Sequence, residues 1–138
     1  MATHATSIVS IKASVEVVVL HTTISETLHA LKTAAQLAQG LSAHIRLLVL
    51  EVVPYPQPLD QPLVPVPITQ RRFRTLAVNA AIETHVDIRL VRDREKAIDA
   101  LLVPHSVVVT GSRRNWWPNA DIRLAKRLER MGHQVVYA

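Results

Sequence analysis

Four consecutive residues, Gly111, Ser112, Arg113 and Arg114, have the side chains best suited to binding a ligand in this sequence. The glycine lets backbone N–H groups come close to a ligand, Ser112 carries a hydroxyl, and the two arginines carry ten N–H donors. A helix is expected to begin shortly after this turn, and its positive end favours an anion. The turn therefore predicts a site for a phosphate or a carboxylate. The alternative is a basic loop that contacts only water.

A second polar turn, His21-Thr22-Thr23, follows the first expected strand, the nearly uncharged segment Val15–Leu20. An imidazole at this position could donate to a phosphate or act as a base, and the alternative is a purely structural histidine. We also include Val53, at the end of the second expected strand. The predicted ligand-binding residues are His21, Thr22, Thr23, Val53, Gly111, Ser112, Arg113 and Arg114.

The sequence carries no pattern typical of catalysis or of a metal site. The seven histidines lack the spacings of metal ligands; they are His4, His21, His29, His44, His85, His105 and His133. There is no nucleophile elbow, no phosphate-binding loop motif and no pair of carboxylates. We therefore expect no catalytic residue and no metal ion.

Two further features could contact a partner. Trp116 and Trp117 are the only tryptophans, and we expect them to plug the end of the sheet or to form a subunit contact rather than to stack on a base. Basic residues recur at helical spacing in two places: Arg123, Lys126, Arg127 and Arg130, and Arg71, Arg72 and Arg74. No nucleic-acid-binding motif accompanies them, so we expect solvated helix faces and no nucleic-acid binding.

Composition limits the class of protein. The chain has 138 residues, 49% of them hydrophobic, a net charge of +5 and no cysteine. The length predicts one domain over residues 14–138, preceded by a tail over residues 1–13. Disulfides and thiolate chemistry are excluded. Neither a secretory signal nor a membrane span is evident, so we expect a soluble, cytoplasmic protein.

Strands and helices alternate along the chain. Mainly apolar, β-branched segments predict strands over residues 15–20, 45–53, 107–109 and 134–137. Alternation of apolar and polar residues predicts a further strand over residues 86–91, with one face exposed, at an edge of the sheet. Helices are expected from Thr23 or Ser25 to Gly40, from Thr69 to about Thr84, from Arg94 (capped by Asp93) to Val103, and from about Ala120 to Met131 before Gly132. This alternation predicts an α/β fold with an open parallel sheet and helices on both faces.

The order of the strands decides which turns meet. If the first three strands add outward in one direction and the last two in the other, the order is 3-2-1-4-5. The carboxyl ends of strands one and four are then neighbours. This places His21–Thr23 beside Gly111–Arg114.

Residues 54–68 form a proline-rich connection, with six prolines between positions 54 and 67. Proline fixes φ and removes a backbone donor, so we expect an extended surface loop rather than a helix. The loop is a simple connection, a lid over the crevice, or an arm that binds another protein. A short strand over residues 8–11 is a further expectation.

Over residues 14–138 the chain resembles the universal stress protein family. The likeness rests on the order of elements, on the polar turn that leads into an Ala/Leu-rich helix (TTISETLHALKTAAQLAQGL), and on the fourth strand with its turn (VVVTGSRR). The resemblance implies a five-stranded fold of the adenine nucleotide alpha hydrolase-like, Rossmann-like type. It also implies a homodimer that pairs through the C-terminal strand.

The ATP-binding signature of that family is eroded here. The family's Asp after strand one falls on His21 or Thr22, and Arg114 stands in place of the second glycine of the signature. The later Gly-Ser/Thr pair falls on Leu124 and Ala125. The side chains of these residues would obstruct the approach of phosphates to the backbone.

These observations predict a non-enzymatic, dimeric stress-related or regulatory binding module with no obligatory cofactor. A first alternative is a protein that binds ATP, AMP or another anion through Gly111–Arg114, with slow ATP hydrolysis as one form of it. A second alternative is an assembly protein that binds a partner through the proline-rich loop and the two tryptophans.

Overall fold

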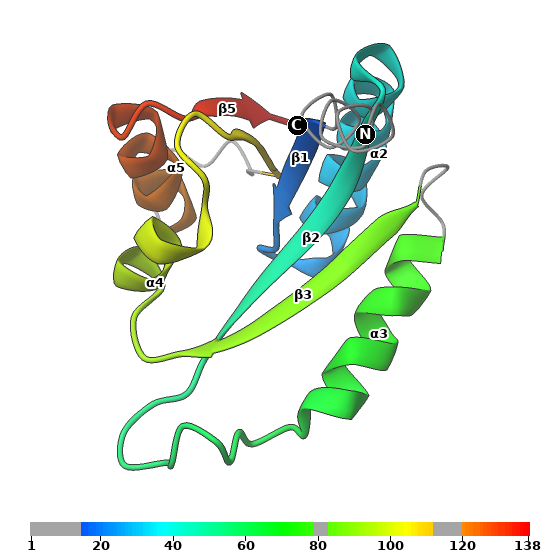
Figure 1. Ribbon diagram of the computed structural model, residues 1–138. Helices are drawn as coiled ribbons and strands as arrows, with labels where there is room; N and C mark the ends of the chain where they lie inside the picture. Colours follow the sequence, from blue (N-terminus) through cyan, green and yellow to red (C-terminus); the bar gives the residue numbers. More distant parts are fainter. Residues whose placement is uncertain (1–14, 79–82, 112–119) are drawn as a thin grey trace, which may run out of the picture.

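The computed structural model describes residues 15–78, 83–111 and 120–138, and its strands form one parallel sheet (Figure 1). The strands are β1 (Val15–Leu20), β2 (Ala43–Val52), β3 (Thr84–Val91), β4 (Val107–Thr110) and β5 (Gln134–Tyr137). Their order is β3-β2-β1-β4-β5, so the predicted order is confirmed.

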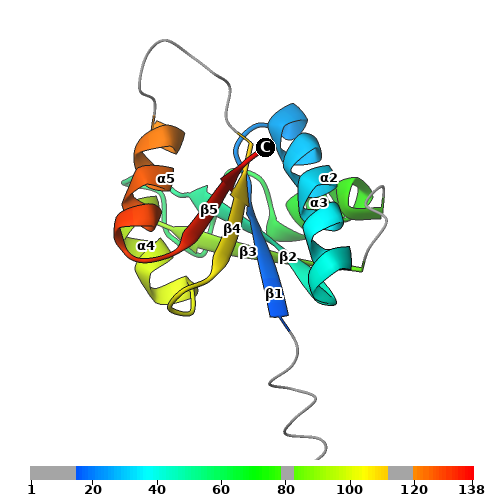
Figure 2. The ribbon, with the colours of Figure 1, turned by 90° about the horizontal axis from the view of Figure 1, so that it is seen from above.

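The helices cover both faces of the sheet, as Figure 2 shows from above. The helices α2 (Ile24–Leu41) and α3 (Val66–Val78) lie on one face, and α4 (Arg94–Leu101) and α5 (Ala120–Arg130) lie on the other. This arrangement confirms the predicted α/β, Rossmann-like fold. None of the described helices is both long enough and apolar enough to cross a bilayer.

The central strand β1 is buried on both faces from Val17 to Leu20, as its run of apolar residues predicts. Val17 and Val19 pack under α2 and α3, whereas Val18 and Leu20 pack under α4 and α5. Successive side chains of a strand alternate between the two faces, so one strand of branched apolar residues supplies both cores.

The N-terminal cap of α2 is Thr23, whose hydroxyl accepts the Glu26 backbone N–H. Ser25 lies inside the helix, so the alternative prediction that it caps the helix is wrong. The prediction that Gly40 ends α2 is also wrong, because the helix runs to Leu41. Its left-handed cap is Ser42, with φ 52°, and the Ser42 N–H donates to the Ala38 carbonyl.

The helix α3 begins earlier and ends earlier than predicted. Backbone N–H groups of Ile68 and Thr69 already donate to the Pro65 carbonyl, so the first turn includes Pro67 and the proline-rich segment ends inside a helix. The first turn leaves its N–H groups without an intrahelical partner, so a proline there loses no bond. Thr84 pairs with Ile45 as part of β3, not of the helix.

The two helices on the other face begin near the predicted residues, but both end earlier than predicted, α5 at Arg130 rather than Met131. Asp93 caps α4 by accepting the N–H groups of Glu95 and Lys96. That helix ends at Leu101 rather than Val103. After α5, Gly132 adopts φ 94°, a conformation that glycine takes without the strain of a side chain.

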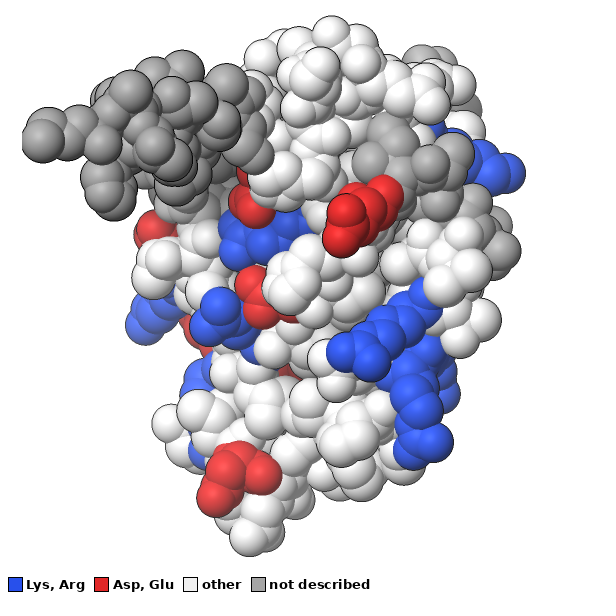
Figure 3. Space-filling model, turned by 45° about the vertical axis from the view of Figure 1, so that its right-hand side comes forward, with Lys and Arg blue, Asp and Glu red and all other residues white. Residues whose placement is uncertain are grey.

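The outer part of the sheet beside α4 carries a row of charges instead of an apolar core. Arg46 of β2 contacts Glu16 at 3.1 Å and Asp87 at 3.1 Å, and Arg89 contacts Asp87 at 2.8 Å. Arg46 also donates to the Leu101 carbonyl at the end of α4. Figure 3 shows acidic and basic side chains next to one another on the side of the molecule that carries α3 and β3. These charges partner one another across three strands.

Candidate functional site

The carboxyl ends of β1 and β4 meet, as the predicted strand order requires. The Thr22 hydroxyl lies 3.2 Å from the Gly111 carbonyl oxygen, to which it donates, although the two residues are 89 positions apart. The predicted crevice residues Ser112, Arg113 and Arg114 lie outside the described residues, as do Trp116, Trp117 and the expected strand over residues 8–11. Their contribution to a site stays a prediction.

Gly111 packs directly against the first turn of α2. A β-carbon built at Gly111 would lie 2.3 Å from the Glu26 carbonyl oxygen and 2.8 Å from the Glu26 β-carbon. These separations are far shorter than van der Waals contact, so only glycine fits between the β4 turn and the helix. The glycine that the sequence suggested for a close approach to a ligand therefore makes a close approach to the chain itself.

The polar groups around Thr22 are bonded to one another. The Thr22 hydroxyl also lies 3.1 Å from a Glu26 carboxylate oxygen, and the Thr22 backbone N–H donates to the Thr27 hydroxyl. The negative charge of Glu26 sits in the first turn of α2, where it interacts favourably with the positive end of the helix dipole. An incoming phosphate at this helix end would meet a carboxylate that is already there.

His21 is held by two helices. Its Nδ1 lies 2.8 Å from the hydroxyl oxygen of Thr27, a fully buried residue of α2. The same hydroxyl oxygen also accepts the Thr22 backbone N–H, so Thr27 ties His21 and Thr22 to α2. The ring also packs edge-on against Phe73 of α3, with centroids 4.6 Å apart. These contacts agree with the structural alternative for His21.

The environment of His21 disfavours its charged form. Burial lowers the pKa of His21 below its ordinary value; nearby Asp121 raises it in part, and Arg94 lowers it further. Arg94 and Asp121 stand at the first turns of α4 and α5 and form an ion pair at 2.8 Å. Sequence reasoning missed this pair because its members are 27 positions apart and neither belongs to a motif.

Val53 is 2% exposed, and both of its backbone polar groups are used within the chain. Its N–H donates to the Val91 carbonyl at 2.9 Å, and its carbonyl accepts Nη1 of Arg92 at 2.9 Å. A ligand would have to displace Arg92 to reach the Val53 carbonyl. The sequence offered no signal for this contact.

Arg92 also organises the beginning of the proline-rich loop. Its Nη1 donates to the Gln57 carbonyl at 2.6 Å, and its guanidinium carbon lies 4.1 Å from the centre of the Tyr55 ring. Tyr55 is nevertheless 79% exposed, and Leu63, farther along the loop, is 82% exposed. The loop thus presents apolar side chains to solvent while Arg92 anchors its first turn to β3.

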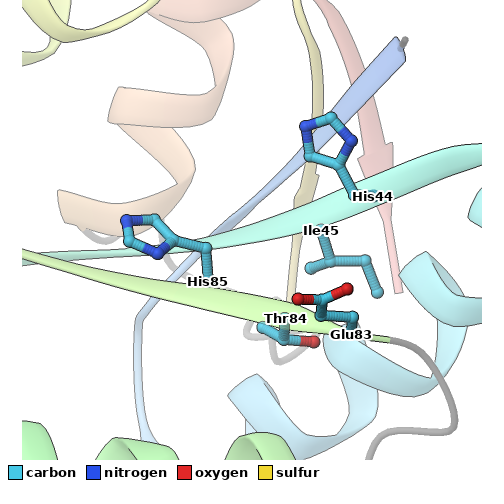
Figure 4. A pocket seen from close by; sticks show the side chains of 5 residues that line it. All are labelled: His44, Ile45, Glu83, Thr84 and His85. Carbon is cyan, nitrogen blue, oxygen red and sulfur yellow. The ribbon is translucent and has the colours of Figure 1, made fainter.

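A hollow at the amino ends of β2 and β3 is lined by His44, Ile45, Glu83, Thr84 and His85 (Figure 4). The view shows that the imidazoles of His44 and His85 point in different directions and do not converge on one point. Across the part of the chain that the structure describes, no group of three or more His, Asp or Glu side chains is arranged to hold a metal ion.

Comparison with known proteins adds no family to this description. The sequence matches no protein-family model, and it has no significant match among curated proteins.

Proposed function

We propose that this protein is a non-enzymatic binding module, similar to those universal stress proteins that lack the ATP signature, with a stress-related or regulatory role. The observation that carries the proposal is the packing of Gly111 against Glu26 at the junction of β1 and β4. In open α/β sheets this junction is where ligands usually bind. Here the glycine, the Thr22 hydroxyl and the Glu26 carboxylate are engaged with one another.

The test is the nucleotide content of the purified protein, measured by chromatography after denaturation. Thermal unfolding with ATP-Mg complements it, with inorganic tripolyphosphate as the control for binding of phosphate alone. We expect no co-purifying nucleotide and no larger stabilisation by ATP than by tripolyphosphate. Stoichiometric ATP, ADP or AMP would overturn the proposal in favour of a nucleotide site at Gly111–Arg114, and Arg113→Ala and Arg114→Ala would then locate it.

We further propose that two copies pair through β5, which is at the edge of the sheet. Backbone N–H groups of Gln134 and Ala138 donate to carbonyls on the β4 side, at Ser106 and Thr110. Donors alternate in direction along a strand, so the N–H groups of Val135 and Tyr137 face the open edge. Such an edge is a template for pairing with a second chain.

Light scattering coupled to size-exclusion chromatography tests the dimer. The variant Val135→Pro removes an outward N–H and leaves the bonds to β4 in place, so we expect it to be monomeric. Val135→Thr keeps the N–H and the branched side chain, and we expect it to remain dimeric. A wild-type protein that is monomeric at micromolar concentration would contradict this part of the proposal.

A further inference from the structure

Helix α5 presents a row of cations on the face opposite to its buried side. Leu124, Ala125 and Leu128 are buried against the sheet. The basic residues recur at intervals of three and four positions, which places them on one side of a helix; they are Arg123, Lys126, Arg127 and Arg130. With a rise of about 1.5 Å per residue, this row extends over roughly 10 Å.

The row lines a hollow and is not a flat surface. Together with Glu95 of α4, the four basic residues of α5 line an open hollow of about 320 Å³. Pockets for small ligands start at about 300 Å³, so the hollow is large enough for a small molecule. Two helices therefore contribute to it, with α5 supplying the cations.

Most of the positive charge in this hollow is not neutralised within the chain. Arg127 already forms an ion pair, because its guanidinium lies 3.0 Å from the Asp99 carboxylate. Arg123, Lys126 and Arg130 are exposed, and no carboxylate of the described residues lies within ion-pair distance of them.

The acidic residues of α5 itself are turned elsewhere. Asp121 pairs with Arg94, and Glu129 accepts the Tyr137 hydroxyl of β5. Four cations thus face three carboxylates, Glu95, Asp99 and Asp93, and the hollow keeps a net positive charge.

We propose that the hollow between α4 and α5 binds a small ligand that carries two or more phosphoryl groups. Guanidinium groups match phosphate oxygens with paired N–H donors, and Lys126 adds a compact ammonium between Arg123 and Arg130. Several cations spread over about 10 Å suit linked phosphates better than a single anion. The proposal does not rest on the crevice between β1 and β4, which lies at a different place in the fold.

Inorganic tripolyphosphate is the probe, and its affinity for the full chain is measured by calorimetric titration at 0.15 M salt. We expect the double variant Arg123→Gln/Arg130→Gln to raise the dissociation constant at least about tenfold, since two charge-assisted contacts are lost. The matched control is Arg72→Gln/Arg74→Gln on α3, which removes the same charge from exposed positions across the sheet. We expect it to change the dissociation constant less than twofold, because distant surface charges are screened.

Each outcome decides the proposal. The proposal is supported if only the α5 double variant loses affinity for tripolyphosphate. Partial recovery of this affinity in Arg123→Lys/Arg130→Lys also supports it. Equal losses in both double variants would show general attraction of anions, and no binding below 1 mM would show no site; either result overturns it. Citrate that binds as well as tripolyphosphate, or an oligonucleotide that binds more than tenfold tighter through the same residues, overturns the assignment to phosphoryl-bearing small molecules.

The same variants separate this proposal from the one on the crevice. Stabilisation by ATP that disappears in Arg123→Gln/Arg130→Gln comes from the α5 hollow. Stabilisation by ATP that persists in this variant comes from another site. If nucleotide also co-purifies with the protein, the result contradicts the proposed function but leaves the proposal on the α5 hollow intact. Far-UV circular dichroism and the unfolding temperature of both double variants establish that they fold like the wild type.

Discussion

The imidazole of His21 packs edge-on against the ring of Phe73, with ring centroids 4.6 Å apart and planes inclined by 73°. This contact joins the end of the central strand β1 to helix α3, and the hydrogen bond between His21 and Thr27 joins the same strand end to α2. The ring of His21 is therefore a connector between three elements. Because the ring is buried at this junction, we expect its protonation to change the stability of the protein.

Wild-type stability is expected to fall as the pH drops below about 6.5. Burial lowers the pKa of His21, so the folded state keeps the imidazole neutral while the unfolded chain takes up a proton near pH 6.5. The contribution of neutral His21 to stability is complete above the pKa of His21 in the unfolded chain. It is lost as the pH falls toward the lower pKa of His21 in the folded state. Urea unfolding of His21→Gln between pH 7.5 and 5 should give a flatter profile than wild type.

The control for this measurement is His29→Gln, since His29 lies on the exposed face of α2. It should reproduce the slope of the wild-type profile. If both variants flatten the profile to the same degree, the contact with Phe73 and Thr27 does not govern the titration.

Gly111→Ala should destabilise the protein by about 1–3 kcal/mol or more, because the new β-carbon would overlap the Glu26 backbone. Gly40→Ala is the matched control: nothing lies within 4 Å of its position, and it is inside α2. Alanine is preferred over glycine in a helix, so this variant should be more stable by about 0.5–1 kcal/mol. Urea unfolding measures both, and a neutral Gly111→Ala would refute the close packing of β4 on α2.

Asp87→Asn should lower stability at pH 7 by about 1 kcal/mol and should flatten the loss of stability below about pH 4. Burial acts to raise the pKa of Asp87, but hydrogen bonds and attraction from Arg89 and Arg46 outweigh it, so the pKa lies below its ordinary value. The stabilisation is present above the unfolded pKa and disappears as the pH falls through the folded one. Acid-induced unfolding monitored by circular dichroism tests this.

Asp60→Asn, in the exposed part of the proline-rich loop, serves as the comparison. It removes the same charge without touching Arg46, so its acid profile should match that of the wild type. Identical profiles for Asp60→Asn and Asp87→Asn would argue against the row of charges across β1, β2 and β3.

Arg92→Met should loosen the start of the proline-rich loop and cost about 1–2 kcal/mol, since two carbonyls, Val53 and Gln57, lose their donor. Cleavage by chymotrypsin after the exposed Leu59 and Leu63 of the loop should become faster, because the guanidinium no longer fixes the start of the loop. Arg74→Met, on the exposed side of α3, should leave both the cleavage rate and the stability near the wild-type values. An unchanged cleavage rate in Arg92→Met would mean that another contact holds the loop.

By itself the sequence determined the fold class, the strand order and several helix ends. Uncharged branched runs such as Val17-Val18-Val19 predict strands buried on both faces, and caps such as Asp93 and Gly132 act within a few residues of where they stand. Signals of this kind are local, so they can be read along the chain. The end of α2 is an exception, because the helix continues past Gly40 and Ser42 takes the left-handed cap conformation.

Only the tertiary structure decided what the candidate site residues do. Gly111 packs against Glu26, and its carbonyl accepts a hydrogen bond from the Thr22 hydroxyl, 89 positions away in the sequence. The Val53 carbonyl accepts a hydrogen bond from Arg92, 39 positions away. The same residue types suit a ligand crevice or an internally bonded junction equally well. Which of the two forms depends on distances of a few tenths of an ångström between separate elements, and no spacing along a chain encodes these distances.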